Sequence, residues 1–302
     1  MTAAALPTTR GFEPGAAPGW RCGRFALSLD IVRIMGVLNV TPDSFSDGGR
    51  FAAMDAALAH ARAMIDQGAD IIDIGGESTR PGAVPVPVDV ESARVLPVLR
   101  ELRGIGVPVS IDTSQPALMR AALELGASII NDVRSLRREG ALEAVRASDC
   151  GLVLMHLQGD PATMQLQPQY RDVVDDVRAW LAQRCEQVCQ AGVAPERIAV
   201  DPGFGFGKTH RHNRQLLAGL ERLHALGRPI LVGLSRKSSL GDMTGRPVTQ
   251  RLAASLAAAL LAVERGARIV RVHDVAATRD ALAVWENVRR EGQQETIDEE
   301  TA

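Results

Sequence analysis

Residues 107–132 read VPVSIDTSQPALMRAALELGASIIND, and this stretch decides the fold class. It holds a short apolar run (107–111), a segment with Leu and Ala at helical spacing (118–125), and a second short apolar run (128–130). Strand-length apolar runs on both sides of an amphipathic helix predict a βαβ unit with buried parallel strands.

The same pattern recurs along the chain. Short β-branched apolar runs stand at residues 34–38, 71–74, 107–111, 128–130, 151–155, 198–200, 230–232 and 269–272. Alanine-rich helical stretches lie between them, and several end in a glycine suited to a left-handed C-cap, namely Gly68, Gly126, Gly192, Gly227 and Gly266. Eight repeats of strand and helix predict an α/β protein with the (β/α)8 TIM-barrel fold in a single domain.

A doubly wound open sheet is the alternative architecture. It would require about five or six strands and a GxGxxG turn after the first one, whereas residues 39–42 read NVTP. We therefore expect one barrel over residues 31–290. An N-terminal extension (1–30) and an acidic C-terminal tail (291–302) carry little periodicity, and both are expected to be loosely ordered.

Composition excludes several classes of partner. The 302 residues include 34 Lys+Arg and 36 Asp+Glu, for a net charge of −2, and only 3% are aromatic, which argues against nucleic-acid binding. The longest nearly apolar run (252–263) is too short for a membrane span, and the first 20 residues lack the apolar core of a signal peptide. Four cysteines are too few for a disulfide scaffold, so we expect a cytoplasmic protein without membrane contacts.

Polar side chains follow nearly every predicted strand, where TIM-barrel active sites lie. They are Asn39; Asp73, Glu77, Ser78, Thr79 and Arg80; Asp112; Asn131 and Asp132; His156; Asp201; Ser235, Arg236 and Lys237; and Arg271 and His273. Any one of them alone suits a loop-entry or cap residue, and His156 suits a catalytic or a structural role equally well. Together they indicate a binding cavity.

The residue types indicate the ligand chemistry. Ionised Asp112 and Asp201 only accept hydrogen bonds and Asn131 does both, which suits a planar heterocycle with several N–H donors on one edge. Lys237, Arg271 and His273, with Arg80, offer donors for a phosphate or diphosphate, and a guanidinium can also stack on a ring. These residues predict a phosphorylated heteroaromatic substrate.

The run DPGFGFGKT (201–209) invites comparison with a phosphate-binding P-loop. The comparison fails because Pro202 stands where GxxxxGK[ST] needs glycine. We expect its three glycines to form a loop that brings Phe206 over the site.

Two long motifs, MGVLNVTPDSFSDGG (35–49) and DIGGESTRPGA (73–83), resemble the signature segments of the dihydropteroate synthase family. Shorter matches follow in order at the strand ends: SIDT (110–113), INDV (130–133), MHLQG (155–159), DPGFGFGK (201–208), GLSRKS (233–238) and RVHDV (271–275). The similarity extends over about residues 33–290.

The resemblance implies a TIM-barrel transferase of folate biosynthesis, usually homodimeric and inhibited by sulfonamides. Such an enzyme condenses 6-hydroxymethyl-7,8-dihydropterin diphosphate with 4-aminobenzoate, with Mg²⁺ as cofactor, to give 7,8-dihydropteroate and diphosphate. Leaving-group chemistry of this kind needs electrostatic stabilisation and positioning more than a nucleophile.

The resemblance also implies roles for particular residues. The pterin would be bound by Asp112, Asn131, Asp201, Lys237 and Arg271, of which Lys237, Arg271, Asp112 and Asp201 are expected to be catalytic. The diphosphate would be bound by Asn39, Arg80, Arg271 and His273, with Mg²⁺ near Asn39 and Asp47. The aminobenzoate would be bound by Thr79, Pro81, Phe206 and Ser235.

Two alternatives share part of this pattern. A methyltetrahydrofolate methyltransferase domain would keep the pterin-edge acids but lack STRP (78–81) and SRK (235–237), which this chain has. A non-catalytic pterin-binding paralogue would be expected to have lost residues of the diphosphate site, whereas Asn39, Arg80, Arg271 and His273 are all present.

Overall fold

The computed structural model describes residues 19–40, 49–77, 86–160 and 163–301, and the side chains of residues 49–53 and 292–301 are not described. Eight parallel strands form one sheet: β3 (Arg33–Asn39), β4 (Ile71–Gly75), β5 (Val109–Asp112), β6 (Ile129–Asp132), β7 (Gly151–Met155), β8 (Ile198–Asp201), β9 (Leu231–Val232) and β10 (Ile269–Val272). Their order is β8-β7-β6-β5-β4-β3-β10-β9, and a parallel bridge between Val200 and Ile230 joins the two edges. The predicted TIM barrel is therefore confirmed.

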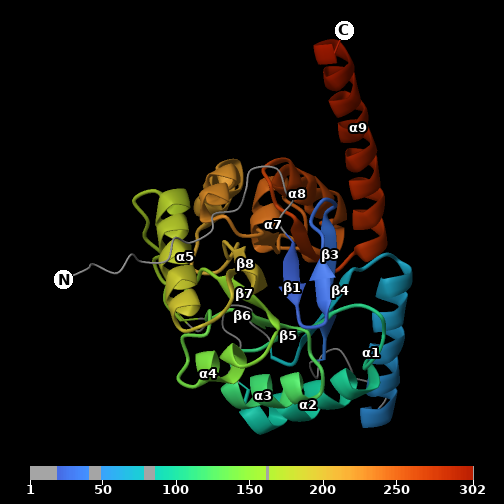
Figure 1. Cartoon of the computed structure of the whole chain (residues 1–302), viewed down its shortest axis with the longest axis vertical. Coiled ribbons are helices and arrows are strands. Elements are labelled where there is room, and N and C mark those ends of the chain that lie inside the picture. Colours follow the sequence, from blue (N-terminus) through green and yellow to red (C-terminus); the bar gives the residue numbers. More distant parts are fainter. Residues whose placement is uncertain (1–18, 41–48, 78–85, 161–162, 302) are drawn as a thin grey trace, which may run out of the picture.

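Helices surround the strands (Figure 1). They are α1 (Gly49–Asp66), α2 (Val88–Glu101), α3 (Pro116–Glu124), α4 (Ala141–Arg146), α5 (Val173–Gln190), α6 (His210–Ala218), α7 (Ser238–Thr244), α8 (Leu252–Glu264) and α9 (Val275–Thr301). Short 3₁₀ turns, η2 (Pro195–Arg197), η3 (Leu220–Leu226) and η4 (Val248–Gln250), lie among them. Glycines follow five of these segments with positive φ, as predicted, for example Gly126 at +95°. Among the described residues, no helix is both long and apolar enough to cross a membrane.

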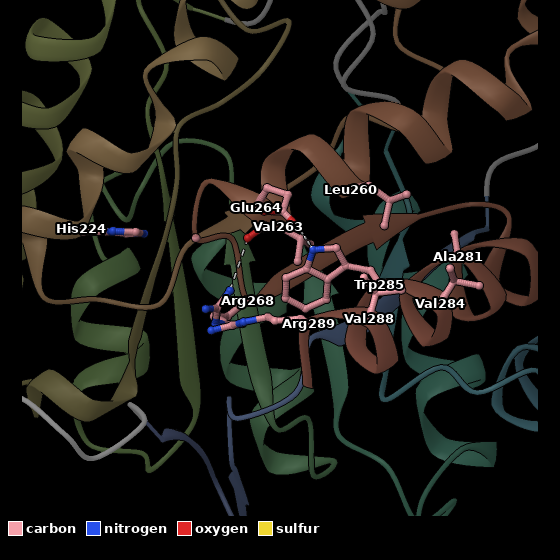
Figure 2. Close-up of a pocket in the computed structure, with 11 residues that line it drawn as sticks. His224, Leu260, Val263, Glu264, Arg268, Ala281, Val284, Trp285, Val288 and Arg289 are labelled. Carbon is pink, nitrogen blue, oxygen red and sulfur yellow. Dashed lines mark hydrogen bonds between the residues drawn. The ribbon is translucent and has the colours of Figure 1, made fainter. Parts of the chain in front are cut away.

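On the outer layer, α8 and α9 pack together and border an open pocket of about 590 Å³ (Figure 2). Leu260, Val263, Trp285 and Val288 line it, so the pocket is largely apolar and belongs to the helix layer rather than to the barrel mouth. The helix α9 continues through Thr301 and includes the residues that were expected to form a loose acidic tail. Glu and Gln are good helix formers, which explains why this stretch prolongs the helix.

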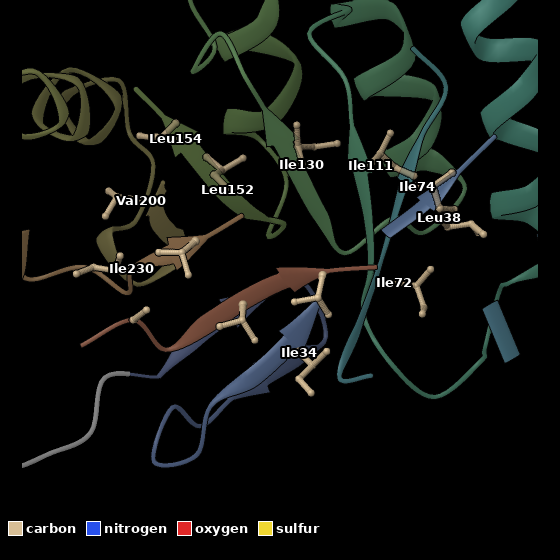
Figure 3. Close-up of a cluster of buried hydrophobic side chains, with 14 of the residues drawn as sticks. Ile34, Leu38, Ile72, Ile74, Ile111, Ile130, Leu152, Leu154, Val200 and Ile230 are labelled. Carbon is tan, nitrogen blue, oxygen red and sulfur yellow. The ribbon is translucent and has the colours of Figure 1, made fainter. Parts of the chain in front are cut away.

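Side chains of each strand alternate between the helix layer and the barrel interior. The outward set, which includes Ile34, Ile72, Ile111 and Ile130, joins the core between strands and helices (Figure 3). A second buried cluster fills the interior of the barrel with Met35, Ile71, Ile129, Val153, Ala199, Leu231 and Ile269. This alternation is the period of two that a strand imposes on its side chains.

A short hairpin packs against the interior cluster of the barrel. It is formed by β1 (Trp20–Cys22) and β2 (Phe25–Leu27), and the expectation that residues 1–30 are loosely ordered is wrong for this part. Trp20 is fully buried and donates from Nε1 to the Arg197 carbonyl at 2.9 Å. A side chain on Gly151 would lie 2.7 Å from Cys22 Sγ, so the hairpin can approach β7 only because that residue is glycine.

Candidate active site

Strand periodicity directs polar side chains into the barrel interior beyond the apolar cluster. Ile71, Ile129, Ala199 and Ile269 all belong to that cluster. The residues two positions later are Asp73, Asn131, Asp201 and Arg271, and they face the same side of their strands. Asn39, Asp112, Asp132 and Asp201 are the last residues of their strands, and Asn131 is the last but one of β6, because the parallel ladder extends through them.

Arg271 crosses the interior and binds two carboxylates. Its Nε donates to Asp73 Oδ2 at 2.6 Å, and its Nη2 donates to Asp112 Oδ2 at 2.9 Å. Asn131 Nδ2 donates to the same Asp73 oxygen at 3.2 Å. Asp73 is fully buried whereas the Arg271 side chain is 23% exposed, so this arginine joins a buried carboxylate to the open side of the site. A planar ring can stack on a guanidinium presented in this way.

Burial and the arginine act in opposite directions on the acids. The pKa of Asp112 is raised to about 7 because the effect of burial outweighs the opposing effect of Arg271. Burial also raises the pKa of Asp201, and the Gly203 N–H, 2.7 Å from its Oδ1, opposes that rise together with Lys237. Although burial works against its charge, Asp73 and Asp112 raise the pKa of Arg271. The acids therefore gain from any ligand that offers N–H donors.

Lys237 and Phe206 lie close together at the mouth of the barrel. The Lys237 ammonium lies 4.3 Å from the centroid of the Phe206 ring, a cation–π distance. Burial and the neighbouring Arg271 lower the pKa of Lys237 to about 8, while Asp201 and Asp112 oppose the shift. The loop after β8 therefore places Phe206 beside Lys237.

Ser235 and His273 form a hydrogen-bonded pair at the ends of neighbouring strands. Ser235 Oγ lies 3.0 Å from His273 Nδ1 and accepts from the His273 backbone N–H at 3.3 Å. Burial and Arg271 lower the pKa of His273 to about 4. At neutral pH this imidazole is uncharged. Unlike Lys237 and Arg271, His273 can therefore offer an anion a hydrogen bond but no positive charge.

Two residues of the predicted set organise loops instead. Arg236 makes a bidentate ion pair with Asp274, at 2.5 and 3.1 Å. Asp132 accepts from the N–H groups of Arg134 and Leu136, at 2.8 and 2.7 Å, and from the Ser114 hydroxyl. Their hydrogen bonds shape the loops after β9 and β6.

Two side-chain oxygens, one each from Asn39 and Asp112, lie close together near the end of β3. A methyl group placed on Gly75 would lie 3.7 Å from Asn39 Oδ1 and 3.9 Å from Asp112 Oδ2, so both oxygens border the same space. The described part of the chain has no group of three His, Cys, Asp or Glu residues placed for a metal ion. Such a sparse oxygen set fits Mg²⁺ that takes its remaining ligands from phosphate and water. Asp47, Thr79, Arg80 and Pro81 lie outside the described residues.

Three buried residues were missed or left without a role by sequence reasoning. Asp73 was noted only as a strand-end acid, Lys208 only within a failed P-loop comparison, and His156 was left open between two roles. Lys208 Nζ lies 2.9 Å from His156 Nδ1, which gives the histidine a structural partner. A signal was present for Lys208, because the chain contains only two lysines and the other is Lys237.

Comparisons with known proteins identify the family of this chain. The family model described as pterin binding enzyme matches residues 35–273. The dihydropteroate synthase of Neisseria meningitidis serogroup B is 53% identical over 274 residues, which cover 88% of this chain and 96% of that protein.

Two solved structures are similar over nearly the whole chain. Xanthomonas albilineans dihydropteroate synthase with 4-aminobenzoic acid is 51% identical with a TM-score of 0.86, covering 90% of this chain and 98% of that one. Burkholderia cenocepacia dihydropteroate synthase complexed with 7,8-dihydropteroate is 54% identical with a TM-score of 0.85, covering 91% and 98%. The chain therefore belongs to the family of pterin-binding enzymes and, within it, to the dihydropteroate synthases.

Proposed function

We propose that the protein condenses 6-hydroxymethyl-7,8-dihydropterin diphosphate with 4-aminobenzoate to give 7,8-dihydropteroate and diphosphate. The observation that carries this is the interior of the barrel mouth, where Arg271 bridges Asp73 and Asp112 at 2.6 and 2.9 Å while its side chain stays 23% exposed. The methyltransferase and non-catalytic alternatives are not favoured, because the similar proteins are named as synthases.

The pterin edge is assigned to Asp112, Asn131 and Asp201. Their carboxylate and amide oxygens accept from ring N–H groups, and the Lys237 ammonium donates to the ring carbonyl and nitrogen. Arg271 stacks on the ring plane while Asp73 and Asp112 hold it in place. Bound in this way, the ring spreads the positive charge that develops on its methylene when the C–O bond breaks, and the acids stabilise that charge.

The diphosphate is assigned to Asn39, Arg80, Arg271 and His273. Neutral His273 donates a hydrogen bond, and the two arginines supply positive charge. Mg²⁺ near Asn39, with Asp47 as a further ligand, would neutralise charge on the leaving group when bound.

The aminobenzoate is assigned to Phe206 and Ser235, with Thr79 and Pro81. Phe206 supplies an apolar wall for the aromatic ring, and sulfonamides are expected to compete for the same place. An aromatic amine is uncharged at neutral pH, so the new C–N bond needs no strong general base and the released proton passes to solvent. Positioning is then the main task of these residues.

The decisive experiment supplies the pterin diphosphate, 4-aminobenzoate and Mg²⁺ and measures diphosphate release. We expect release that depends on aminobenzoate and is competitively inhibited by a sulfonamide. Binding of the pterin without any release would instead support the non-catalytic alternative. Asp201→Ala is expected to abolish pterin binding, and Arg271→Ala to weaken both pterin and diphosphate binding.

We also propose that the protein is a homodimer that associates through α8 and α9. Exposed apolar side chains gather there, with Leu261 at 46%, Val284 at 67% and Val288 at 69% exposure, beside the pocket shown in Figure 2. Contiguous apolar surface of this kind is typical of an interface. Sedimentation should give a dimer for the wild type and a monomer for the double variant Val284→Glu/Val288→Glu; a monomeric wild type would refute this arrangement.

A cytoplasmic location is part of the same proposal. All four cysteines are free, and three of them, Cys22, Cys150 and Cys185, are buried, which suits a reducing compartment. Cell fractionation with a tagged chain tests it.

A further inference from the structure

Lysine is rare in this chain. Lys208 and Lys237 are its only lysines among 34 basic residues, and arginine supplies every other fixed positive charge. Both lysines lie at the mouth of the barrel, and Lys208 is only 3% exposed. Lysine offers a compact ammonium with three donors around one nitrogen, whereas arginine offers a flat fork. The geometry around Lys208 shows why a compact ammonium is needed there.

Three acceptors surround the Lys208 ammonium at short distance. They are His156 Nδ1 at 2.9 Å, the Gly203 carbonyl at 2.9 Å and the Phe206 carbonyl at 3.0 Å; the His156 carbonyl is farther away at 3.4 Å. Three donors thus meet three close acceptors. Two of these belong to the loop after β8 that carries Phe206, and the third belongs to the end of β7.

His156 is suited to be an acceptor and not a proton donor. Burial, and secondarily Lys208, lowers its pKa to about 2, so the ring is uncharged at working pH values. Because an ammonium can only donate, the contact with Lys208 selects the tautomer whose Nδ1 carries the lone pair. Its ring makes an edge-on contact with Trp180, with centroids 5.2 Å apart. These contacts hold the imidazole in place beneath the loop.

Other groups also anchor the loop of residues 203–207. Gln165 Nε2 donates to the Gly205 carbonyl at 2.6 Å, and Asp201 Oδ1 accepts from the Gly203 N–H at 2.7 Å. Asn213 Oδ1 accepts from the Gly205 N–H at 2.8 Å, and the Tyr170 hydroxyl donates to the Gly207 carbonyl at 2.7 Å. A side chain on Gly203 would lie 2.0 Å from the His156 carbonyl, so the loop lies directly against β7. In the described ranges, Lys208 is the one side chain that hydrogen-bonds to the backbone of Phe206, whose own N–H donates to the Gly203 carbonyl at 3.1 Å.

We propose that Lys208 is a positioning residue whose ammonium holds the 203–207 loop against His156 and thereby fixes Phe206 beside Lys237 as a wall of the aminobenzoate site. This inference rests on the proposed function. Lys208 does not itself touch the substrates; it acts through the backbone of Phe206. Its removal should therefore affect aminobenzoate far more than the pterin.

The protonation state of Lys208 decides how many carbonyls it can hold. Burial lowers its pKa to about 7; Asp201 opposes the shift and Lys237 adds to it, and His156 is uncharged. A neutral amine has two donors instead of three. We therefore expect the hold on the loop to weaken as the pH rises above about 7.

An NMR titration tests the contact without any activity measurement. Labelling the wild-type protein with [ε-¹³C]lysine gives only two signals, which Lys237→Met assigns by removing one. We expect the Lys208 signal to titrate near pH 7. Titration near the ordinary lysine value of about 10.4 would overturn the proposal.

Steady-state kinetics test the positioning role. Lys208→Met should raise KM for 4-aminobenzoate about tenfold and change KM for the pterin diphosphate less than about twofold, as expected for lost hydrogen bonds on one side of the site. In the wild type, KM for 4-aminobenzoate should rise with a midpoint at the measured Lys208 pKa. Equal changes in both KM values, or no change in either, would refute the role.

Arg184→Met is the matched control, because Arg184 donates to the Ser135 and Leu136 carbonyls at 2.7 and 2.9 Å and thus holds a different loop. It should leave the ratio of the two KM values unchanged. If Lys208→Met does not fold, the wild-type protein still tests the proposal. A KM for 4-aminobenzoate that does not change with pH around the measured Lys208 pKa refutes it. A wild type that releases no diphosphate with aminobenzoate refutes the proposed function instead, and the NMR result stands separately.

Discussion

Asp73 shows how one residue organises several others. Its Oδ2 accepts from Arg271 Nε at 2.6 Å and from Asn131 Nδ2 at 3.2 Å, so it orients both a stacking group and a pterin-edge group. Its Oδ1 has no hydrogen-bond partner among the described residues, so Arg271 supplies the compensating charge for this buried carboxylate and Asn131 adds one neutral hydrogen bond.

We expect Asp73→Asn to weaken pterin binding at least about tenfold and to lower the free energy of unfolding by about 2–3 kcal/mol, because a buried ion pair loses one charge. Calorimetric titration and urea unfolding measure the two effects. Asp70→Asn is the control, since Asp70 also binds two arginines, Arg33 at 3.0 Å and Arg279 at 2.6 Å, away from the site. Wild-type pterin affinity in Asp73→Asn would contradict the orienting role.

Among the structural elements, two short segments complete the barrel, one at the candidate site and one at its interior cluster. The 203–207 loop carries Phe206 into the site, and the β1–β2 hairpin packs against the interior cluster of the barrel. Both depend on a glycine that permits close approach, Gly203 against the His156 carbonyl and Gly151 against Cys22. Their contacts join residues far apart in the chain, which a local pattern does not reveal.

Gly203→Ala should lower the free energy of unfolding by more than the left-handed backbone conformation of this residue accounts for. Gly203 (φ +71°) and Gly104 (φ +78°) share a left-handed conformation, but a side chain on Gly104 would meet nothing within 4 Å. We expect Gly104→Ala to cost about 1–2 kcal/mol, which is the conformational term, and Gly203→Ala to cost more and to raise KM for 4-aminobenzoate. Equal unfolding free energies for the two variants would argue against the close contact.

Trp20→Ala should destabilise the fold by about 3–5 kcal/mol, because it empties a fully buried site and removes the hydrogen bond to Arg197. Chemical denaturation measures this. Phe25→Ala, in the partly buried strand of the same hairpin, should cost much less. A loss below about 1 kcal/mol for Trp20→Ala would show that the hairpin is dispensable to the barrel.

At the scale of the whole molecule, the net charge of −2 hides a separation of charge within the barrel mouth. Asp73, Asp112 and Asp201 stand on β4, β5 and β8, and Lys237 and Arg271 stand at β9 and β10. Barrel closure through Val200 and Ile230 brings the ends of this series together. Burial of so many ionisable groups makes stability depend on pH.

Glu91 on α2 allows one such contribution to be isolated. It is fully buried, and neither carboxylate oxygen has a hydrogen-bond partner in the described ranges. Burial raises its pKa from 4.5 to about 7, so the unfolded chain releases the proton at lower pH than the folded protein does. Glu91 therefore makes the wild type lose stability as the pH rises from about 4.5 to 7.

Glu91→Gln should remove that loss. We expect the variant to gain stability over the wild type progressively across this window, by up to about 3 kcal/mol, and to hold a constant advantage above pH 7. Urea unfolding at several pH values measures the difference. A difference that does not vary with pH would show that Glu91 does not titrate with a raised pKa.

Sequence alone determined the barrel and much of its site, because both are written in local periodicity. Along each strand, side chains alternate between the helix-facing layer and the barrel interior. A polar residue two positions after a buried interior residue, such as Asp201 after Ala199, is therefore predictable at the barrel mouth. Glycine spacing likewise predicted where helices end.

Only the tertiary structure decided which of these groups meet and in what charge state. Arg271 contacts Asp73, which lies 198 positions away in the sequence, and Trp20 contacts Arg197, which lies 177 positions away. Only the folded barrel brings such distant residues together. The near-neutral pKa of Lys208 and the uncharged state of His273 arise from burial, which depends on everything packed around them. Desolvation and long-range contact are properties of the folded chain, and for that reason no local pattern contains them.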